Sequence, residues 1–164
     1  HTQSSETAAT LGGTVQYRTS TTGSWSTTKP SITNAGTQTV YVQVAGDSNH
    51  NTKDCGNITN TISKKDIAVT WGTITSFVYT GSAQAPSITT PVNGVTVGTT
   101  TEKLNLTRTL TNVNVGENYT STASCSSVTG GQAKCSNYTL TNATSHKYSV
   151  LTKKHTVYTP RQTK

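Results

Sequence analysis

Two stretches of the chain repeat each other at a distance of about eighty residues. Residues 34–59 reappear as residues 114–139, and each copy opens with Asn-x-Gly and closes with Cys-x-Asn-x-Thr. A similar sequence containing two adjacent lysines follows each copy, at residues 62–69 and 151–158. Self-similarity over such a period is typical of proteins assembled from repeated structural units.

The repeat predicts where the units begin and end. We expect a first unit in residues 1–64, a second in residues 65–154, and a tail, residues 155–164, that resembles the opening of a further unit. Because the first unit is shorter ahead of the repeat than the second, we expect it to lack one or two opening strands. The chain begins at His1 rather than Met, which we interpret as a processed product or an excised segment.

The composition favours strands over helices. Thr and Ser make up about a third of the 164 residues, and only 30% of the residues are hydrophobic, which predicts thin cores of the sandwich kind. Residues 14–19 alternate in polarity, as do residues 40–44, and the second unit contains seven or eight short strand patterns separated by turn signals. The expected fold is all-β, with two tandem immunoglobulin-like β-sandwich domains.

The charged residues argue against several classes of function. The net charge is +7, but the thirteen basic residues occur singly or in pairs without interleaved aromatics, so we expect no nucleic-acid partner. No apolar run approaches the length of a membrane span. The six acidic residues and four histidines are dispersed along the chain. We therefore expect no enzyme activity, no metal site and no cofactor.

The three cysteines divide into a pair and a single residue. Cys125 and Cys135 flank a Gly-Gly turn that brings neighbouring strands together, which predicts a disulfide. Cys55 repeats Cys135 but has no partner at the position that would match Cys125. It is expected to be an unpaired thiol, buried in preference to bridging two chains.

Other polar patterns have ordinary structural explanations. Residues 47–54 resemble the start of a calcium loop, but Thr52 replaces the glycine of the sharp turn and Ile58 stands where the bidentate acid belongs, so we interpret the segment as a polar hairpin turn. A lysine-to-asparagine cross-link needs a buried acid beside the pair, for which Glu102 and Glu117 are candidates.

The aromatic residues allow two uses. Trp25, Trp71, Phe77 and the seven tyrosines can supply a sugar-binding platform or the core. Trp71 and Phe77 lie in strand patterns, and a chain with so few large apolar residues needs them inside. Tyr17 and Tyr41 are the candidates for exposure.

One set of short motifs occurs at residues 17–19, 23–26, Pro30, 34–37, 40–42 and 44–50, and another at residues 77–86, at the opening of the second unit. Through these motifs most of residues 14–154 resemble the bacterial immunoglobulin-like repeats of the MBG type, which occur in tandem in large surface proteins. Gln38 departs from the aromatic that the family often has there, and Cys125 and Cys135 are not general features of it. The resemblance implies an extracellular, non-catalytic spacer or adhesion module and implies no ligand.

We therefore expect a structural module of a bacterial surface or extracellular protein, either a spacer or a fibre subunit. In the fibre, Thr156, Val157 and Tyr158 of one copy would donate the strand that the first unit of the next copy lacks. The expected partners are copies of the chain or neighbouring immunoglobulin-like repeats. The alternative is an adhesin module that binds a cell-surface glycan or a host surface protein, which exposed aromatics on one loop face would favour.

Overall fold

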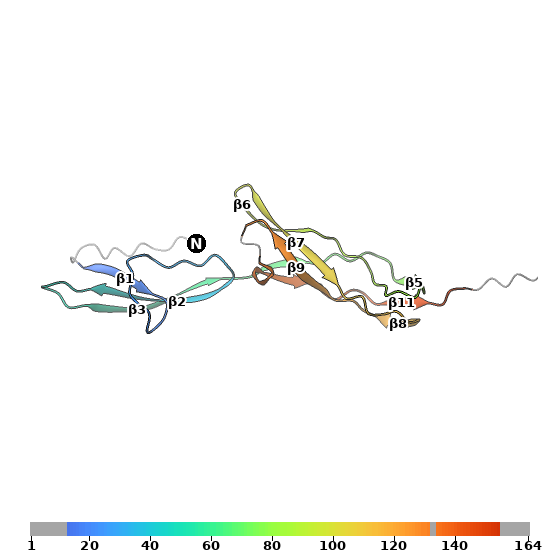
Figure 1. The fold of residues 1–164 in the computed structure, drawn as a ribbon, viewed down its shortest axis with the longest axis horizontal. Helices are drawn as coiled ribbons and strands as arrows, with labels where there is room; N and C mark the ends of the chain where they lie inside the picture. Colours follow the sequence, from blue (N-terminus) through green and yellow to red (C-terminus); the bar gives the residue numbers. More distant parts are fainter. Residues whose placement is uncertain (1–12, 132–133, 155–164) are drawn as a thin grey trace, which may run out of the picture. The chain divides into compact units, whose positions relative to one another are not determined.

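The computed structural model describes residues 13–131 and 134–154. The contacts divide the chain into two compact units, residues 1–64 (unit 1) and 65–164 (unit 2). Among the described residues the regular structure consists of strands and one short 3₁₀ helix, Cys135–Asn137 (η1). The chain is thus all-β, with several sheets (Figure 1). No helix in the described ranges is long and apolar enough to cross a membrane.

The described part of unit 1 forms one antiparallel sheet in the order β1-β2-β3. Its strands are β1 (Thr14–Arg18), β2 (Gly36–Ala45) and β3 (Lys53–Ile62). The alternating pattern of residues 14–19 forms β1, and the alternating valines of residues 40–44 lie in β2, with Val40 buried. Gly56 has a φ of +82° where the register between β2 and β3 shifts, which is the conformation of a bulge that glycine favours.

Unit 2 has three sheets, in the orders β6-β7-β9, β10-β4 and β5-β11-β8. Its strands are β4 (Lys65–Ala68), β5 (Ser76–Val78), β6 (Val92–Val97), β7 (Thr100–Arg108), β8 (Gly116–Tyr119), β9 (Ala123–Thr129), β10 (Tyr138–Thr141) and β11 (Tyr148–Leu151). Two of the pairings are parallel, β4 with β10 and β5 with β11. All the other strand pairings in this unit are antiparallel.

The larger core of unit 2 lies between two of these sheets. Leu104 and Leu106 of β7 alternate with polar residues and are 0% and 5% exposed. They form one cluster with Ala123 of β9 and Tyr138 of β10, against which Ile67 of β4 packs. Because residues from β6-β7-β9 and from β10-β4 meet in this cluster, the arrangement is consistent with a β-sandwich.

Equivalent strand pairings occur within unit 1 and within unit 2. In unit 1 Gly36 pairs with Ile62, and Gly116, the repeat counterpart of Gly36, pairs with Val150 in unit 2. The end of β3 is therefore the counterpart of β11. In the part of unit 1 that the structure describes, no strand plays the role that β4 and β5 play in unit 2.

Burial reflects this difference between the units. Val150, which pairs with Gly116 in unit 2, is 1% exposed, whereas Ile62, which pairs with Gly36 in unit 1, is 38% exposed. In the described part of unit 1, Val40 is the one hydrophobic residue that is fully buried. A three-stranded sheet with so little buried apolar area is only marginally stable by itself.

Candidate functional site

The feature of unit 2 with the clearest mechanical consequence is the pairing of its opening strands with its closing strands. In the β5–β11 pair, Phe77 lies beside Val150 and Val78 beside Leu151. The Ser149 amide donates to the Thr75 carbonyl at 2.9 Å, and the Tyr79 amide donates to the Leu151 carbonyl at 2.8 Å. We call β4–β10 and β5–β11 the terminal strand pairs.

Tyr148, the first residue of β11, packs against Phe77 of β5. This residue is 1% exposed, and its ring meets Phe77 edge-on with centroids 5.7 Å apart. Its hydroxyl accepts a hydrogen bond from the Asn112 amide group at 2.9 Å and donates one to the Gln84 carbonyl at 2.9 Å. The site therefore combines apolar packing with a satisfied buried hydroxyl, which holds β11 in a fixed position.

Cys125 and Cys135 form a disulfide with a Cα–Cα distance of 5.8 Å. The bond joins β9 to η1, and both cysteines pack against the larger core. Gly130 and Gly131 have φ of +83° and +50°, so the Gly-Gly turn that predicted the bridge uses the left-handed conformations glycine permits. The disulfide closes a short loop beside β10, the partner of β4.

The expectation that Cys55 is buried was wrong. Cys55 is exposed and free, and its thiol donates to the Lys53 carbonyl at 3.7 Å. The reason is that β3 borders the sheet and nearly all its side chains are exposed, so a strand pattern there does not imply a core.

Glu102 is 8% exposed on β7 and accepts a hydrogen bond from the Tyr138 hydroxyl. The Val95 amide donates to the same hydroxyl at 3.1 Å. Burial, followed by the hydrogen bond to Glu102, raises the pKa of Tyr138 above its ordinary value. This buried pair joins β7 to β10.

The acids suggested as helpers for a lysine-to-asparagine cross-link do not take that position. Lys103 donates to Asn93 on the exposed face of the β6–β7 hairpin. Side chains alternate along a strand, so the neighbouring Glu102 points to the opposite, buried face. Glu117 is exposed on β8.

Two aromatic residues of unit 1 lie beside an arginine. The Arg18 guanidinium lies 4.3 Å from the ring centroid of Trp25 and 5.7 Å from that of Tyr41. Tyr17 and Tyr41 are half-buried, not exposed. Because Arg18 lies over both rings, the cluster is a cation–π contact between the β1–β2 pair and the segment that connects these strands.

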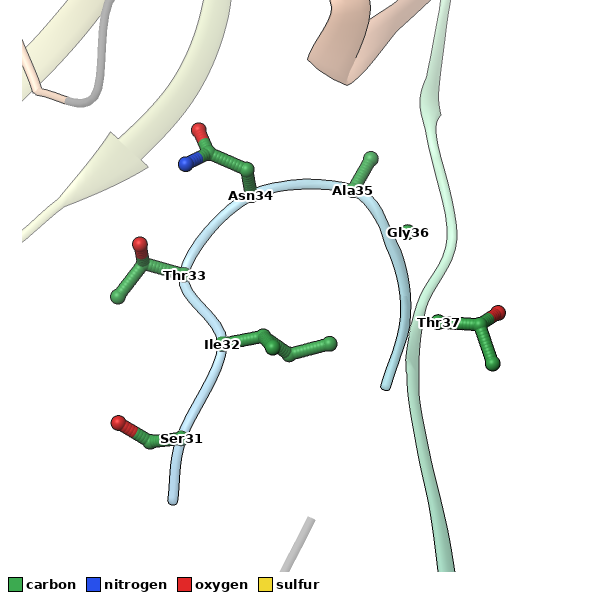
Figure 2. Close-up of a pocket in the computed structure, with 7 residues that line it drawn as sticks. All are labelled: Ser31, Ile32, Thr33, Asn34, Ala35, Gly36 and Thr37. Carbon is green, nitrogen blue, oxygen red and sulfur yellow. The ribbon is translucent and has the colours of Figure 1, made fainter. Parts of the chain in front are cut away.

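Two loops of unit 1 carry several polar groups each. Figure 2 shows a hollow formed by the seven consecutive residues 31–37, in which Ser31, Thr33 and Asn34 point away from the turn and Ile32 points into it. In the turn after β2, Asp47 accepts hydrogen bonds from the Asn49 amide and His50, which lower the pKa of Asp47. The polar groups in Figure 2 do not converge as they do in ligand sites.

The remaining candidate residues are the histidines, the acidic residues and the expected donor strand. Within residues 13–131 and 134–154, no group of three or more His, Cys, Asp or Glu is placed to hold a metal ion. His146 pairs with the Ile74 carbonyl at 3.1 Å. The proposed donor strand, Thr156, Val157 and Tyr158, lies outside the described residues.

Comparison of the chain with family models, curated proteins and solved structures gave no match. The terminal strand pairs were not foreseen from the sequence. The only signal available was that residues 76–79 read as a strand opening the second unit, which does not identify its partner.

Proposed function

We propose that the chain is a load-bearing structural module of a bacterial surface or extracellular protein, built from two tandem immunoglobulin-like units of the MBG type. The observation that carries this proposal is the parallel pairing of the opening strands of unit 2 with its closing strands. The repeat supports it, since arrays of similar units are a common way of building spacers.

The direction of the strands decides how the unit responds to tension. Pulling the two ends of the chain draws β5 and β11 in opposite directions along their common axis, because the two strands run parallel. The hydrogen bonds across the pair are then sheared together. In an antiparallel hairpin pulled from its open end, the bonds break one after another at lower force. The terminal strand pairs therefore favour resistance to force along the chain.

The disulfide supports the same role and the proposed location. Bridges of this kind persist in oxidising compartments, including the cell surface and the extracellular space. The bond between Cys125 and Cys135 also keeps the enclosed loop from extending when the unit is pulled. A spacer that retains its length under load benefits from both effects.

The test is a comparison of pulling directions by single-molecule force spectroscopy. In a Cys55→Ser chain, unit 2 is pulled either from the chain ends or through cysteines placed at Asn93 and Lys103, an exposed and directly paired position on the β6–β7 hairpin. We expect a several-fold higher unfolding force for the first direction. Equal forces in the two directions would remove the basis of the proposal.

A further inference from the structure

One face of the unit 1 sheet carries planar polar side chains in two rows. Side chains alternate along a strand, so residues in direct register across β1, β2 and β3 share a face. The rows run across the three strands and consist of Gln16–Gln43–Asp54 and Arg18–Tyr41–Asn57. We call these six residues the polar face of unit 1. Five belong to residue types with planar polar groups, and the sixth, Tyr41, is aromatic.

The Arg18 guanidinium is held in place by aromatic rings. Tyr41 lies beside it in the same row, and Trp25 lies over it from the segment that connects β1 to β2. Ser26 next to Trp25 exchanges two backbone hydrogen bonds with Tyr17, at 2.7 and 2.9 Å, which fixes this segment to β1. A stacked guanidinium is a planar fork held ready to bind a carboxylate through two hydrogen bonds.

The charge of Arg18 is not compensated within the part of the chain that the structure describes. No acid there forms an ion pair with it, and its Nε atom is buried without a hydrogen-bond partner. Arg18 itself is only half-buried. A half-buried cation without a counter-charge favours an anionic partner, and its geometry favours a carboxylate.

The second row offers hydrogen-bonding groups of both kinds. Gln43 Nε2 donates to Gln16 Oε1 at 2.8 Å, which leaves an amide oxygen on Gln43 and amide hydrogens on Gln16 for a ligand. Asp54 is exposed, and its Oδ1 atom accepts from the Gly56 amide at 2.7 Å while Oδ2 keeps its lone pairs. Hydroxyl groups both donate and accept, so a polyhydroxylated ligand matches this row.

The polar face lacks the apolar anchors of a protein interface. Protein interfaces are centred on buried aromatic and aliphatic residues. In the described part of unit 1 the exposed large hydrophobic residues are Ile58 and Ile62. Both lie on the opposite face, because Ile58 is in register with the buried Val40. The polar face therefore fits a hydrated, polyhydroxylated partner better than a protein.

We propose that the polar face of unit 1 binds a carboxylated glycan. The Arg18 guanidinium pairs with the carboxylate of one sugar, and the Gln16–Gln43 amides bond to hydroxyl groups of its neighbour. Asp54 lies in the row that does not contain Arg18, so its charge keeps the sugar carboxylate in the Arg18 row. This binding activity is additional to the load-bearing role, which depends on the strand pairs of unit 2.

The first experiment is a titration followed by fluorine NMR. The full Cys55→Ser chain is labelled with 5-fluorotryptophan and titrated with a hyaluronan octasaccharide, an oligogalacturonate and sialyllactose, at about 0.15 M salt. At least one of the three should shift the signal of Trp25 saturably and leave that of Trp71 in unit 2 unchanged. The methyl ester of that glycan should bind at least tenfold more weakly. No shift with any of the three, or equal binding of acid and ester, would overturn the proposal.

Two further ligands separate this site from other kinds of binding. Dextran sulfate measures adhesion through the net charge of +7 alone, and a hexaglutamate peptide stands for a protein partner. Neither should bind at the Trp25 signal as tightly as the carboxylated glycan. Tighter binding of the sulfated polymer or of the peptide would contradict a glycan site.

Variants test the two rows separately. Arg18→Lys keeps the charge but loses the planar fork, and affinity should fall at least tenfold. The control Lys29→Ala removes a charge from an exposed position of unit 1 and should leave affinity unchanged. Gln43→Glu keeps the size of the side chain and adds a repelling carboxylate, which should also weaken binding at least tenfold.

The urea transition of each variant shows whether unit 1 remains folded. If Arg18→Lys unfolds it, Gln43→Glu decides the question, and unchanged affinity in that variant would overturn the assignment. None of these results depends on the unfolding force of unit 2, so failure of the glycan site and failure of the load-bearing role are observed separately.

Discussion

At the scale of single residues, Tyr138 joins three strands of unit 2 through one hydroxyl. It lies on β10, accepts from the Val95 amide of β6 and donates to the carboxyl of Glu102 on β7. Removing one partner of a buried hydrogen bond costs about 1 to 3 kcal/mol, because the other partner is left unsatisfied. The contact joins β10, the partner of β4, to the sheet β6-β7-β9.

Substituting this tyrosine tests the contact. Tyr138→Phe keeps the ring and removes the hydroxyl, and we expect the free energy of unfolding of unit 2 to fall by about 2 kcal/mol at pH 7. The matched control is Tyr79→Phe, whose ring is 41% exposed, and which should change stability by less than about 0.5 kcal/mol. Urea denaturation followed by fluorescence measures both.

The raised pKa of Tyr138 gives this contact a pH dependence. The folded state holds the phenolic proton more tightly than the unfolded chain, so the stabilisation is complete below the ordinary tyrosine value near 10 and is lost as the pH rises through the raised folded pKa. The stability difference between the wild type and Tyr138→Phe should therefore shrink between pH 9 and pH 12. A difference that stays constant over this range would show that the hydroxyl is not buried as described.

At the scale of elements, the disulfide fixes β9 to the segment that leads into β10. Its sequence separation is 10. Closing a loop of that size lowers the conformational entropy of the unfolded chain, which stabilises the folded unit by about 2 to 3 kcal/mol. The effect belongs to unit 2 alone, because unit 1 has only the free Cys55.

Removing the bridge should therefore weaken one unit. The double variant Cys125→Ala with Cys135→Ala should lower the free energy of unfolding of unit 2 by about 2 to 3 kcal/mol and leave unit 1 unchanged. Trp71 lies in unit 2 and Trp25 in unit 1, so the fluorescence of Trp25→Phe chains follows unit 2. An equal loss in both units would contradict the assignment.

The bonds that flank β5–β11 should carry the force. Tyr79→Pro removes the amide that donates to the Leu151 carbonyl, and the extended conformation that proline imposes on the preceding residue suits Val78 in β5. We expect a lower unfolding force along the chain, with Tyr79→Phe as the control that keeps the amide. An unchanged force would place the mechanical resistance elsewhere in the unit.

The sequence predicted these elements unevenly. The alternating polarity of residues 14–19 and 40–44 predicted β1 and part of β2, and the Gly-Gly turn predicted the Cys125–Cys135 bridge, because both signals are local. The parallel partner of β5 lies more than sixty residues away and leaves no local signal. The exposure of Cys55 was missed for the same reason, since burial of a strand depends on which strands cover it.

At the scale of the whole molecule, the two units differ in how much apolar surface they bury. Both hydrophobic clusters of the described residues lie in unit 2. In the described residues of unit 1 the sheet consists of β1, β2 and β3, with Val40 as its one fully buried hydrophobic residue. We therefore expect unit 1 to unfold before unit 2.

Fluorine NMR can follow the two units in one chain. With two tryptophans, one per unit, a chain labelled with 5-fluorotryptophan should give two folded signals. The signal of Trp25 should disappear at a lower urea concentration than that of Trp71. Coincident transitions would contradict the difference in stability between the two units.

The most direct measurement for the central claim is the force–extension curve of the full chain pulled by its ends. We predict that unit 1 opens first at low force and that unit 2 opens later in one step at a clearly higher force. Reduction of the Cys125–Cys135 bond should lengthen that second step by about 30 Å, the extended length of the released loop. A unit 2 that opens at or below the force of unit 1 would contradict a load-bearing role for the terminal strand pairs.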